Sequence, residues 1–336
     1  MLTARQKCLV VEAGSAKSLI STLEEAGRLN ADSTAERLYI FIPNGYYDLD
    51  SLTLTLVSGY NVTLVGESME GTVIRNAPSV ANEGISKTGT LLNRGHDVVV
   101  MDLTLKNDLD YYHSGAAGRA VCWQDKGWRT IFKRVRMLSY QDTYYSHSEE
   151  CQHYFEDSEI HGTIDFICGA GDVYFNRCLL VTEKRNADGS GTNVIAAPRT
   201  STTEYGFVFN ECVIRNDVST FHYARGWHTH PRCAFLNTRL ETPQLLCKER
   251  YDPNGIRAVN NEFFEYNTTD ANGNDITPKS NVVTFVCKDE RRDAETIISA
   301  REASRYQLKN IYPDWRPEKV VKRVERKALK LRRRYL

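Results

Sequence analysis

From Leu38 onward the chain consists largely of short runs rich in apolar and β-branched residues, some of them alternating with polar residues, and these runs predict many short β-strands. Clear examples are residues 39–42, 52–56, 62–65 and 98–100. The N-terminal part differs, because residues 10–28 predict a short strand followed by a helix that ends near Gly27. In that helix, apolar residues recur at intervals of three or four positions, which is typical of one buried face.

One six-residue pattern recurs through the β-rich part. An apolar or aromatic residue is followed by a polar residue two positions later, a small or apolar residue three later, and Leu, Ile or Met five later. The pattern starts at Val100, Phe132, Phe155, Phe175, Phe209 and Phe235, at intervals of 32, 23, 20, 34 and 26 residues. This variable period favours an all-β solenoid with insertions between its coils, whereas a β-sandwich of alternating strands is the alternative. Asn176, Asn210 and Asn237 fall near the same place in their coils, which suits turn or ladder positions.

The pattern becomes helical after Asp289, mainly over residues 294–306 and 315–336. Nine Lys or Arg residues lie among residues 319–334, opposite a set of apolar residues. That apolar set is Val320, Val321, Val324, Ala328 and Leu331. We therefore divide the chain into a β-rich domain, residues 1–316, and a basic amphipathic helical tail, residues 317–336. We interpret the tail as a helix packed along the solenoid with a solvated charged face, and a role at a membrane surface or with a partner is the alternative.

Composition narrows the function further. The 336 residues are enough to bury a large core, and the formal net charge of zero argues against a general nucleic-acid binder. No apolar stretch approaches the length of a membrane span. We expect a monomer with no nucleic-acid partner and no membrane span. Residues 1–7 contain no leader-like segment, so the chain as written is expected in the cytoplasm; the alternative is a secreted or periplasmic protein whose leader was removed.

The cysteines and histidines do not predict a metal site. The nine cysteines are widely spread and contain no pair separated by two residues. Several lie at apolar positions of strand-like runs, so we expect most of them to be free and buried, which fits a reducing compartment. None of the eight histidines shows a zinc-binding spacing, and we expect neither a metal nor a cofactor.

Two aspartates are the strongest candidates for chemistry. Asp142 and Asp165 each lie beside a strand-like run, and they are 23 residues apart, which is about one coil of the predicted solenoid. Adjacent coils stack about 4.8 Å apart. At that separation two carboxylates repel by roughly 3 kcal/mol at an effective dielectric of about 20, so one of them keeps its proton at a higher pH. Such a pair can supply a nucleophile and a general acid, while the simpler alternative is that both aspartates cap turns.

Three further residues can complete such a site. Arg225 can hold one aspartate ionised through charge-assisted hydrogen bonds, and the Trp227 ring suits stacking on a sugar. Gln141 offers an amide donor for an oxyanion. The alternatives are a surface salt bridge for Arg225 and a core position for Trp227.

These pieces together resemble the pectin methylesterase family, carbohydrate esterases that demethylate polygalacturonan. The resemblance rests on residues 140–143 with Tyr145 and His147, 162–167 with Gly169, 206–209 with Cys212, and 225–227. Weaker similarity extends over residues 10–315. The order and spacing of the motifs are specific to the family.

The resemblance implies a right-handed parallel β-helix that hydrolyses methyl esters of galacturonate in pectin or homogalacturonan, without a metal. By position, Asp165 is then the nucleophile, Asp142 is the general acid and later the base, and Arg225 orients Asp165. Gln141 would help to hold the oxyanion. The implied substrate-binding residues are Trp227, Tyr145 and Cys168.

The chain also departs from the family pattern. A second oxyanion glutamine is usual 23 residues before the acid, where this chain has Arg119, and Gln124 is the alternative donor. The proline after the arginine is Gly226, and the aromatic residue three after the nucleophile is Cys168. The remaining alternatives are a pectin-binding β-helix that is non-catalytic or altered in specificity, and a polysaccharide lyase. A lyase would require an acidic calcium-binding cluster, and the sequence contains no dense group of carboxylates.

Overall fold

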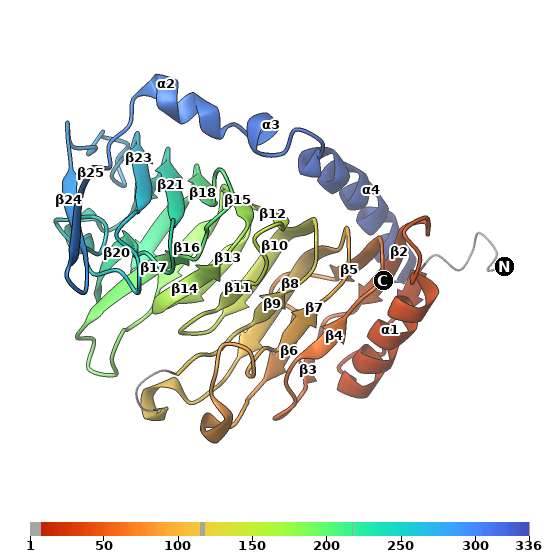
Figure 1. Cartoon of the computed structure of the whole chain (residues 1–336). Coiled ribbons are helices and arrows are strands. Elements are labelled where there is room, and N and C mark those ends of the chain that lie inside the picture. Colours follow the sequence, from red (N-terminus) through yellow and green to blue (C-terminus); the bar gives the residue numbers. More distant parts are fainter. Residues whose placement is uncertain (1–7, 115–117, 217, 336) are drawn as a thin grey trace.

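The protein is a right-handed parallel β-helix, seen in a computed structural model that describes residues 8–114, 118–216 and 218–335 (Figure 1). Strands of successive coils pair in parallel, which confirms the predicted solenoid and excludes the β-sandwich. Residues 1–7, on which the leader expectation rests in part, and Leu336 of the predicted tail lie outside the described residues.

The coils have three faces, and two of them form one 16-stranded sheet. The first face contains β1 (Cys8–Val10), β2 (Leu38–Ile42), β5 (Val62–Gly66), β8 (Val99–Asn107), β10 (Thr130–Leu138), β12 (Gln152–Glu156), β15 (Asp172–Asn176), β18 (Phe207–Asn210), β21 (Arg232–Leu236) and β23 (Glu262–Tyr266). The second face contains β3 (Gly45–Asp48), β6 (Thr72–Asn76), β13 (Glu159–Gly162), β16 (Leu179–Thr182), β19 (Val213–Asn216) and β22 (Arg239–Leu240). The long strands β8 and β10 run through both faces, which is why the two join.

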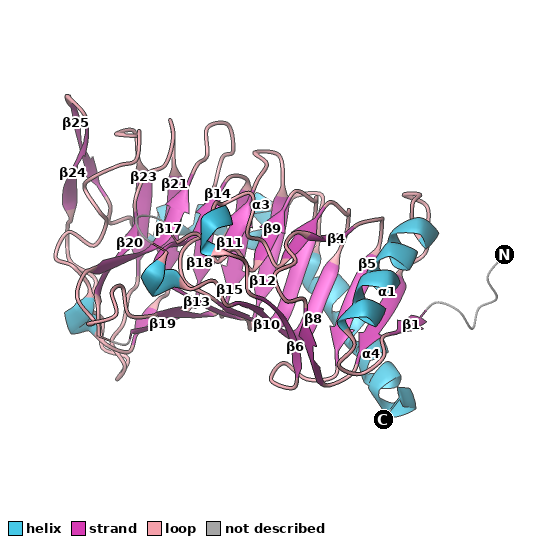
Figure 2. Ribbon diagram, turned by 90° about the horizontal axis from the view of Figure 1, so that it is seen from below, coloured by secondary structure: helices cyan, strands magenta, loops and turns pink. Residues whose placement is uncertain are grey.

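The third face is a separate seven-stranded sheet (Figure 2). Its strands are β4 (Thr55–Val57), β7 (Leu91–Asn93), β9 (Trp123–Asp125), β11 (Tyr144–Ser146), β14 (Ile164–Gly169), β17 (Thr192–Pro198) and β20 (Thr220–Ala224). The run predicted at residues 52–56 forms a strand only from Thr55, because the backbone of Leu54 is left-handed and bends the chain (φ 58°).

The recurring six-residue pattern marks the bend between the first and second faces. Its first residue is a buried phenylalanine in five coils, and the rings stack with centroids 4.2 to 4.6 Å apart. Its polar third residue has a left-handed backbone in every coil, with φ between 49° and 56°. The left-handed residues are Asp102, Arg134, Asp157, Arg177, Glu211 and Asn237. The pattern therefore encodes a stacked core residue followed by a turn, which explains why it tolerates insertions elsewhere in the coil.

The asparagines predicted at ladder positions do form a ladder. The side-chain amide of Asn210 donates to Asn176 at 3.3 Å, and that of Asn237 donates to Asn210 at 2.9 Å. Asn267 extends the ladder by one coil, donating to Asn237 at 2.8 Å. Each coil is thus tied to the next by a side-chain hydrogen bond in addition to its backbone pairing.

The helices cover one end and one face of the solenoid (Figure 1). They are α1 (Ala16–Leu29), α2 (Ala300–Ala303), α3 (Leu308–Ile311) and α4 (Pro317–Tyr335), with short 3-10 turns at Val80–Asn82, Tyr111–His113, Pro243–Leu245 and Ser304–Tyr306. Helix α1 lies where the sequence predicts it, and Leu19, Leu23 and Ala26 bury its apolar face in the core at the N-terminal end. Helix α4 packs on the first face, and the division of the chain at residue 316 stays a prediction.

The prediction of helix from residue 294 was wrong at its start. Strands β24 (Val282–Cys287) and β25 (Glu290–Glu295) form an antiparallel hairpin, and helix begins only at Ala300. Strand β25 is almost wholly exposed and strongly charged, so it carries no alternation of buried and exposed residues to identify it. All nine cysteines are free and six are buried, as the sequence predicted.

Candidate active site

The two predicted aspartates lie on neighbouring coils of the third face. Asp142 lies two residues before the start of β11, and Asp165 is the second residue of β14. The two strands pair Tyr144 with Ile167 and Tyr145 with Cys168, an offset of 23 residues. The structure therefore brings Asp142 and Asp165 together at equivalent positions of adjacent coils.

Local backbone geometry turns both carboxyl groups into one pocket. Asp142 and Asp165 have left-handed backbones (φ 59° and 55°), a conformation that aspartate tolerates better than most residues. The register of β14 against β17 also shifts between Ile164 and Ile167, so Asp165 lies in a bulge. Both residues are 4 to 5% exposed and line the pocket.

Arg225 binds Asp165 through two hydrogen bonds. Its Nε donates to Oδ1 at 2.8 Å and its Nη2 donates to Oδ2 at 2.5 Å. Arg225 follows β20, and its backbone N–H donates to the Ala196 carbonyl at 3.0 Å, which fixes the residue two coils along from Asp165. A bidentate arginine of this kind holds a carboxylate in one orientation and favours its ionised form.

The two carboxyl groups therefore differ electrostatically. Burial, and then the charge of Asp165, hold the pKa of Asp142 well above its usual range. Burial also raises the pKa of Asp165, but the charge and hydrogen bonds of Arg225 act in the opposite direction. Because Arg225 contacts Asp165, a proton shared by this pair is expected to reside on Asp142.

The pocket that contains the pair has a volume of about 310 Å³. It is lined by Ile85, Arg119, Gln141, Asp142, Asp165, Cys168, Arg225, Trp227 and Ile256. Seven of these nine residues were selected from the sequence. Ile85 and Ile256 were missed because they lie in loops outside the strand pattern, and nothing in their local sequence marks them.

Of the two alternative oxyanion donors, only Arg119 lies in the pocket. Arg119 forms a parallel bridge with Gln141 one coil along. Glu83, another residue that the sequence did not suggest, accepts the Arg119 backbone N–H at 2.8 Å and contacts its guanidinium at 3.4 Å. Gln124 lies instead on β9, is 1% exposed and does not line the pocket.

An aromatic wall borders the pocket. Trp227 lines it, and Tyr145 lies behind with its ring 6.5 Å from the Trp227 ring and only 5% exposed. Cys168 packs between Tyr145 and the two aspartates, and burial followed by their charges raises the pKa of its thiol. The guanidinium of Arg199 lies 5.5 Å from the Trp227 ring, so the wall carries a cation that the sequence motifs did not reveal.

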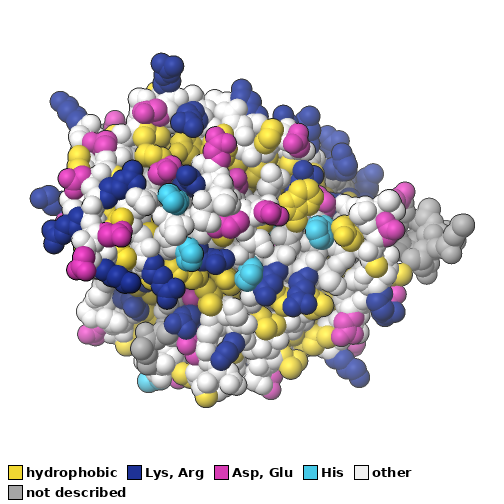
Figure 3. Space-filling model, in the orientation of Figure 1, with side chains coloured by type: hydrophobic (Ala, Val, Ile, Leu, Met, Phe, Trp, Pro, Cys, Tyr) yellow, Lys and Arg dark blue, Asp and Glu magenta, His cyan; other side chains and the backbone are white. Residues whose placement is uncertain are grey.

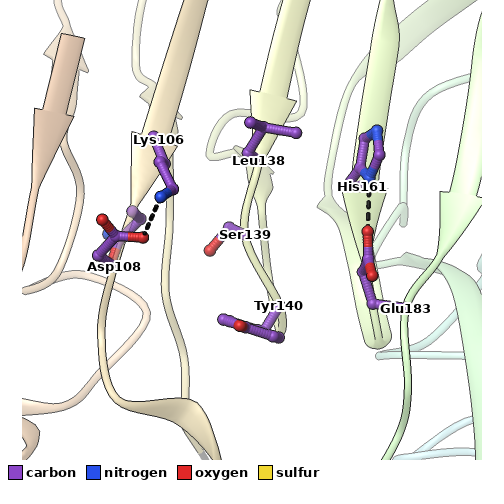
Figure 4. Close-up of a pocket in the computed structure, with 8 residues that line it drawn as sticks. Lys106, Asp108, Leu138, Ser139, Tyr140, His161 and Glu183 are labelled. Atoms are coloured by element: carbon purple, nitrogen blue, oxygen red, sulfur yellow. Dashed lines mark hydrogen bonds and ion pairs between the residues drawn. The ribbon is translucent and has the colours of Figure 1, made fainter. Parts of the chain in front are cut away.

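A second pocket, of about 220 Å³, is lined by Tyr140 and by charged side chains (Figure 4). Its charged side chains point toward one another in pairs. Lys106 contacts Asp108 at 3.0 Å, and His161 contacts Glu183 at 2.6 Å. Its charges are therefore paired one to one, whereas in the first pocket Arg225 binds Asp165 and leaves the Asp142 carboxyl outside that ion pair.

Neither pocket is a metal site by composition. Within residues 8–114, 118–216 and 218–335, no three His, Cys, Asp or Glu side chains gather as metal ligands. Over the same ranges, every helix is too short or too polar to cross a bilayer.

Comparison with known proteins agrees with this geometry. The family model for pectinesterases matches residues 8–269. Pectinesterase A of Dickeya chrysanthemi is 28% identical to this chain, in an alignment that covers 83% of each of the two sequences. Probable pectinesterase 50 of Arabidopsis thaliana is 27% identical over 70% of this chain, and the chain spans 63% of that protein's length.

Solved structures show the same fold. A pectin methylesterase from Erwinia chrysanthemi superposes with a TM-score of 0.67 and 23% identity, over 92% of this chain and 98% of that one. A pectin methylesterase from carrot gives a TM-score of 0.68 at 20% identity, over 90% and 92% of the two chains. The parallel β-helix is therefore common to this chain and to these enzymes.

Proposed function

Because this chain belongs to the pectinesterase family, we propose that it hydrolyses methyl esters of galacturonate residues in pectin and releases methanol. The observation that carries the proposal is the asymmetric pair of aspartates in one pocket. Arg225 contacts Asp165 at 2.8 Å and 2.5 Å, while burial and the neighbouring charge favour the protonated form of Asp142. An ionised nucleophile beside a protonated acid is the arrangement that ester cleavage requires.

The first half of the proposed reaction forms an acyl-enzyme. A carboxylate oxygen of Asp165 attacks the carbonyl carbon of the methyl ester, and the carbonyl oxygen becomes an oxyanion. The amide of Gln141 and the guanidinium of Arg119 donate hydrogen bonds to that oxyanion. The intermediate collapses as Asp142 gives its proton to the methoxy oxygen, so that methanol leaves and an anhydride joins Asp165 to the galacturonate.

The second half returns the enzyme to its starting state. The carboxylate of Asp142 takes a proton from water, and the resulting hydroxide attacks the galacturonate carbonyl of the anhydride. Asp165 leaves as a carboxylate held by Arg225, and the galacturonate is released with a free carboxyl group. Asp142 is again protonated, so each cycle consumes one ester and one water and yields one methanol.

The aromatic wall suits a sugar substrate. The Trp227 ring lines the pocket beside the aspartates, and its flat face can stack on a sugar ring. One of the matching pectin methylesterase structures contains a bound hexasaccharide. We therefore propose that the pocket accepts one esterified sugar of a longer polymer, with Trp227 beside it.

Methanol release from a methyl-esterified pectin tests the proposal. We expect the wild-type chain to release methanol and Asp165→Asn to release almost none, because asparagine removes the nucleophile. Asparagine also tolerates a left-handed backbone, so the variant should fold. A urea unfolding curve for each protein serves as the control.

The same assay separates the alternatives. Unsaturated sugar ends without methanol would indicate a polysaccharide lyase. Pectin binding without either product would indicate a non-catalytic binding protein. Wild-type methanol release that persists in Asp165→Asn would remove Asp165 as the nucleophile.

A further inference from the structure

Helix α4 buries its apolar side against the first face of the β-helix. Val321, Val324, Ala328 and Leu331 are buried and share one hydrophobic cluster with residues of β2, β5, β8 and β10. Arg332 anchors the same side, because it donates to the Gly66 carbonyl at 2.9 Å and contacts Asp102. The apolar residues of the helix are thus largely committed to the fold.

The opposite side of α4 is a row of exposed basic residues, which we call the basic face. It consists of Lys319, Lys322, Arg323, Arg326, Lys327, Lys330, Arg333 and Arg334, all exposed. At about 100° per residue these eight positions fall within an arc of about 140°, on a row about 22 Å long. In Figure 3 the dark blue of Lys and Arg gathers over this helix.

The basic face has no acidic partners in the described parts of the chain. None of its eight side chains forms an ion pair there. On the helix itself, Glu325 instead contacts Arg134 at 2.5 Å. Many basic residues elsewhere are paired: Arg75, Lys133, Arg177, Arg215 and Arg250 each contact a carboxylate.

This arrangement disfavours the isolated helix. Lys319 and Lys322 lie near its N-terminus, where the helix dipole disfavours positive charge. Like charges also recur at spacings of three and four residues, as at Lys322, Arg326 and Lys330, and each such pair costs about 0.2–0.5 kcal/mol. Since the chain as a whole has zero formal net charge, the concentration of charge is local to α4. A bound polyanion would remove this repulsion.

We propose that the basic face of α4 binds de-esterified polygalacturonate, at a site separate from the catalytic pocket. The identity of this polyanion rests on the proposed function, because the reaction exposes one carboxylate at each sugar it acts on. A product chain therefore gains the charge that complements the basic face. Binding there would hold the protein on polymer that already carries free carboxylates.

Two other polyanions fit less well. A membrane-surface helix needs a free apolar side, but Val321, Val324, Ala328 and Leu331 are buried in the fold. A single-stranded nucleic acid is usually held by several stacked aromatic rings as well as charge, whereas α4 carries one aromatic residue, Tyr335, at its C-terminal end. A polyuronide requires only a row of cations along a stiff chain.

Binding of fully de-esterified polygalacturonate to the full-length chain tests the inference. The polymer has no ester, so wild-type protein can be used and turnover does not enter the readout. We compare wild type with Lys319→Glu, Arg323→Glu, Arg326→Glu and Lys330→Glu combined. The matched control combines Lys17→Glu, Lys248→Glu, Lys279→Glu and Lys288→Glu, which makes the same change in net charge at exposed positions elsewhere.

We expect the α4 variant to lose at least about tenfold in affinity and the control less than about twofold. Wild-type binding should weaken strongly between about 0.05 M and about 0.3 M salt. Replacing the same four α4 residues by alanine removes their positive charges and also the repulsion between them. That variant should therefore fold, and its affinity for the polymer should still be lower than that of wild type.

Equal losses in the α4 variant and the control, or unchanged binding in both α4 variants, would overturn the inference. Tighter wild-type binding to an RNA homopolymer or to anionic vesicles at matched salt would also overturn it. If polygalacturonate binds through α4 while wild type releases no methanol, the proposed function fails and the binding site stands.

Discussion

Two regions of this molecule contain a buried aspartate with the same left-handed backbone conformation but with different surroundings. Asp102 under α4 and Asp165 in the pocket have φ values of 56° and 55°, and each is 5% exposed. Asp102 is held by Arg134, whose Nε lies 2.5 Å from Oδ1, and also by Arg332 of the covering helix. Asp165 is held by Arg225 and lies beside a second carboxyl, that of Asp142, in a pocket of about 310 Å³.

The comparison teaches that a left-handed aspartate is a general turn element of this solenoid. Such an aspartate becomes a candidate for chemistry where its carboxyl lines a pocket and lies beside a second carboxyl. At Asp102 two arginines and a packed helix complete the surroundings. At the pocket, Arg225 hydrogen-bonds to Asp165 and not to Asp142, so Asp165 is favoured as the charged member of the pair and Asp142 as the protonated one.

Among substitutions in the pocket other than Asp165→Asn, Asp142→Asn is expected to reduce methanol release the most. Loss of the proposed general acid should lower the rate of methanol release about 100- to 10,000-fold. Wild-type activity should fall as pH drops through the pKa of Asp165, which lies above its usual value, and fall again as pH rises through the raised pKa of Asp142. The variant should lose the second, alkaline decline.

A pH–rate profile of both proteins, with unfolding curves at each pH, checks this prediction. An alkaline decline that is the same in Asp142→Asn and wild type would show that another group supplies the proton.

Arg119→Ala should have the next largest effect, because it removes one proposed oxyanion donor. We expect kcat to fall about 100-fold, which is typical for such a donor, with a smaller change in KM. Arg119→Gln keeps a donor and should recover part of kcat. Equal activity of the wild type and the alanine variant would exclude Arg119 from the reaction and leave Gln141 as the candidate donor.

At Asp102, which α4 covers, Arg332→Gln should lower the free energy of unfolding and leave the rate of methanol release unchanged. Asp102 loses a charged partner beneath α4, so the free energy of unfolding should fall by about 2 kcal/mol. Methanol release per folded molecule should stay at the wild-type level, measured with urea unfolding on the same samples. A drop in activity without a drop in stability would mean that the two regions are coupled.

A smaller, pH-dependent effect is expected for His161→Gln on the second face. His161 lies between Glu159 at 2.5 Å and Glu183 at 2.6 Å; burial lowers its pKa, but these contacts outweigh burial and raise it. A raised pKa in the folded state adds stability below the unfolded-state pKa, and this stability is lost as pH rises through the folded-state value.

The wild type should therefore exceed His161→Gln in unfolding free energy at acidic pH, by up to about 1 kcal/mol, and the difference should shrink in alkaline solution. Urea unfolding at about pH 5.5 and about pH 9 measures it. A difference that grows with pH would contradict the assigned ion pairs.

Much of the fold could be predicted because it repeats. The phenylalanine that opens the pattern in five coils and the polar residue two positions later recur in the sequence, and they fix the stacked core and the turn of those coils. The spacing of 23 residues likewise predicts that Asp142 and Asp165 meet. The prediction failed for elements that neither belong to the repeat nor bury one face, such as the exposed hairpin strand β25.

The site was predictable only where it lies on or next to the strands. Asp142, Asp165 and Arg225 follow the pattern of the coils, but Ile85, Ile256 and the cation Arg199 enter from loops or from outside the motifs. The sequence also left Arg119 and Gln124 as alternatives, because a local shift of the alignment decides which of the two occupies the position of the second oxyanion donor. Only the three-dimensional register settles that choice.

The most direct test compares Asp165→Asn with Asp102→Asn, two identical changes at residues of the same backbone conformation. Methanol release from pectin and the free energy of unfolding are measured for both. We predict that Asp165→Asn loses about 1,000-fold or more in activity per folded molecule, whereas Asp102→Asn keeps its activity per folded molecule and loses about 2 kcal/mol of stability. An active Asp165→Asn protein, or a stable but inactive Asp102→Asn protein, would contradict the account.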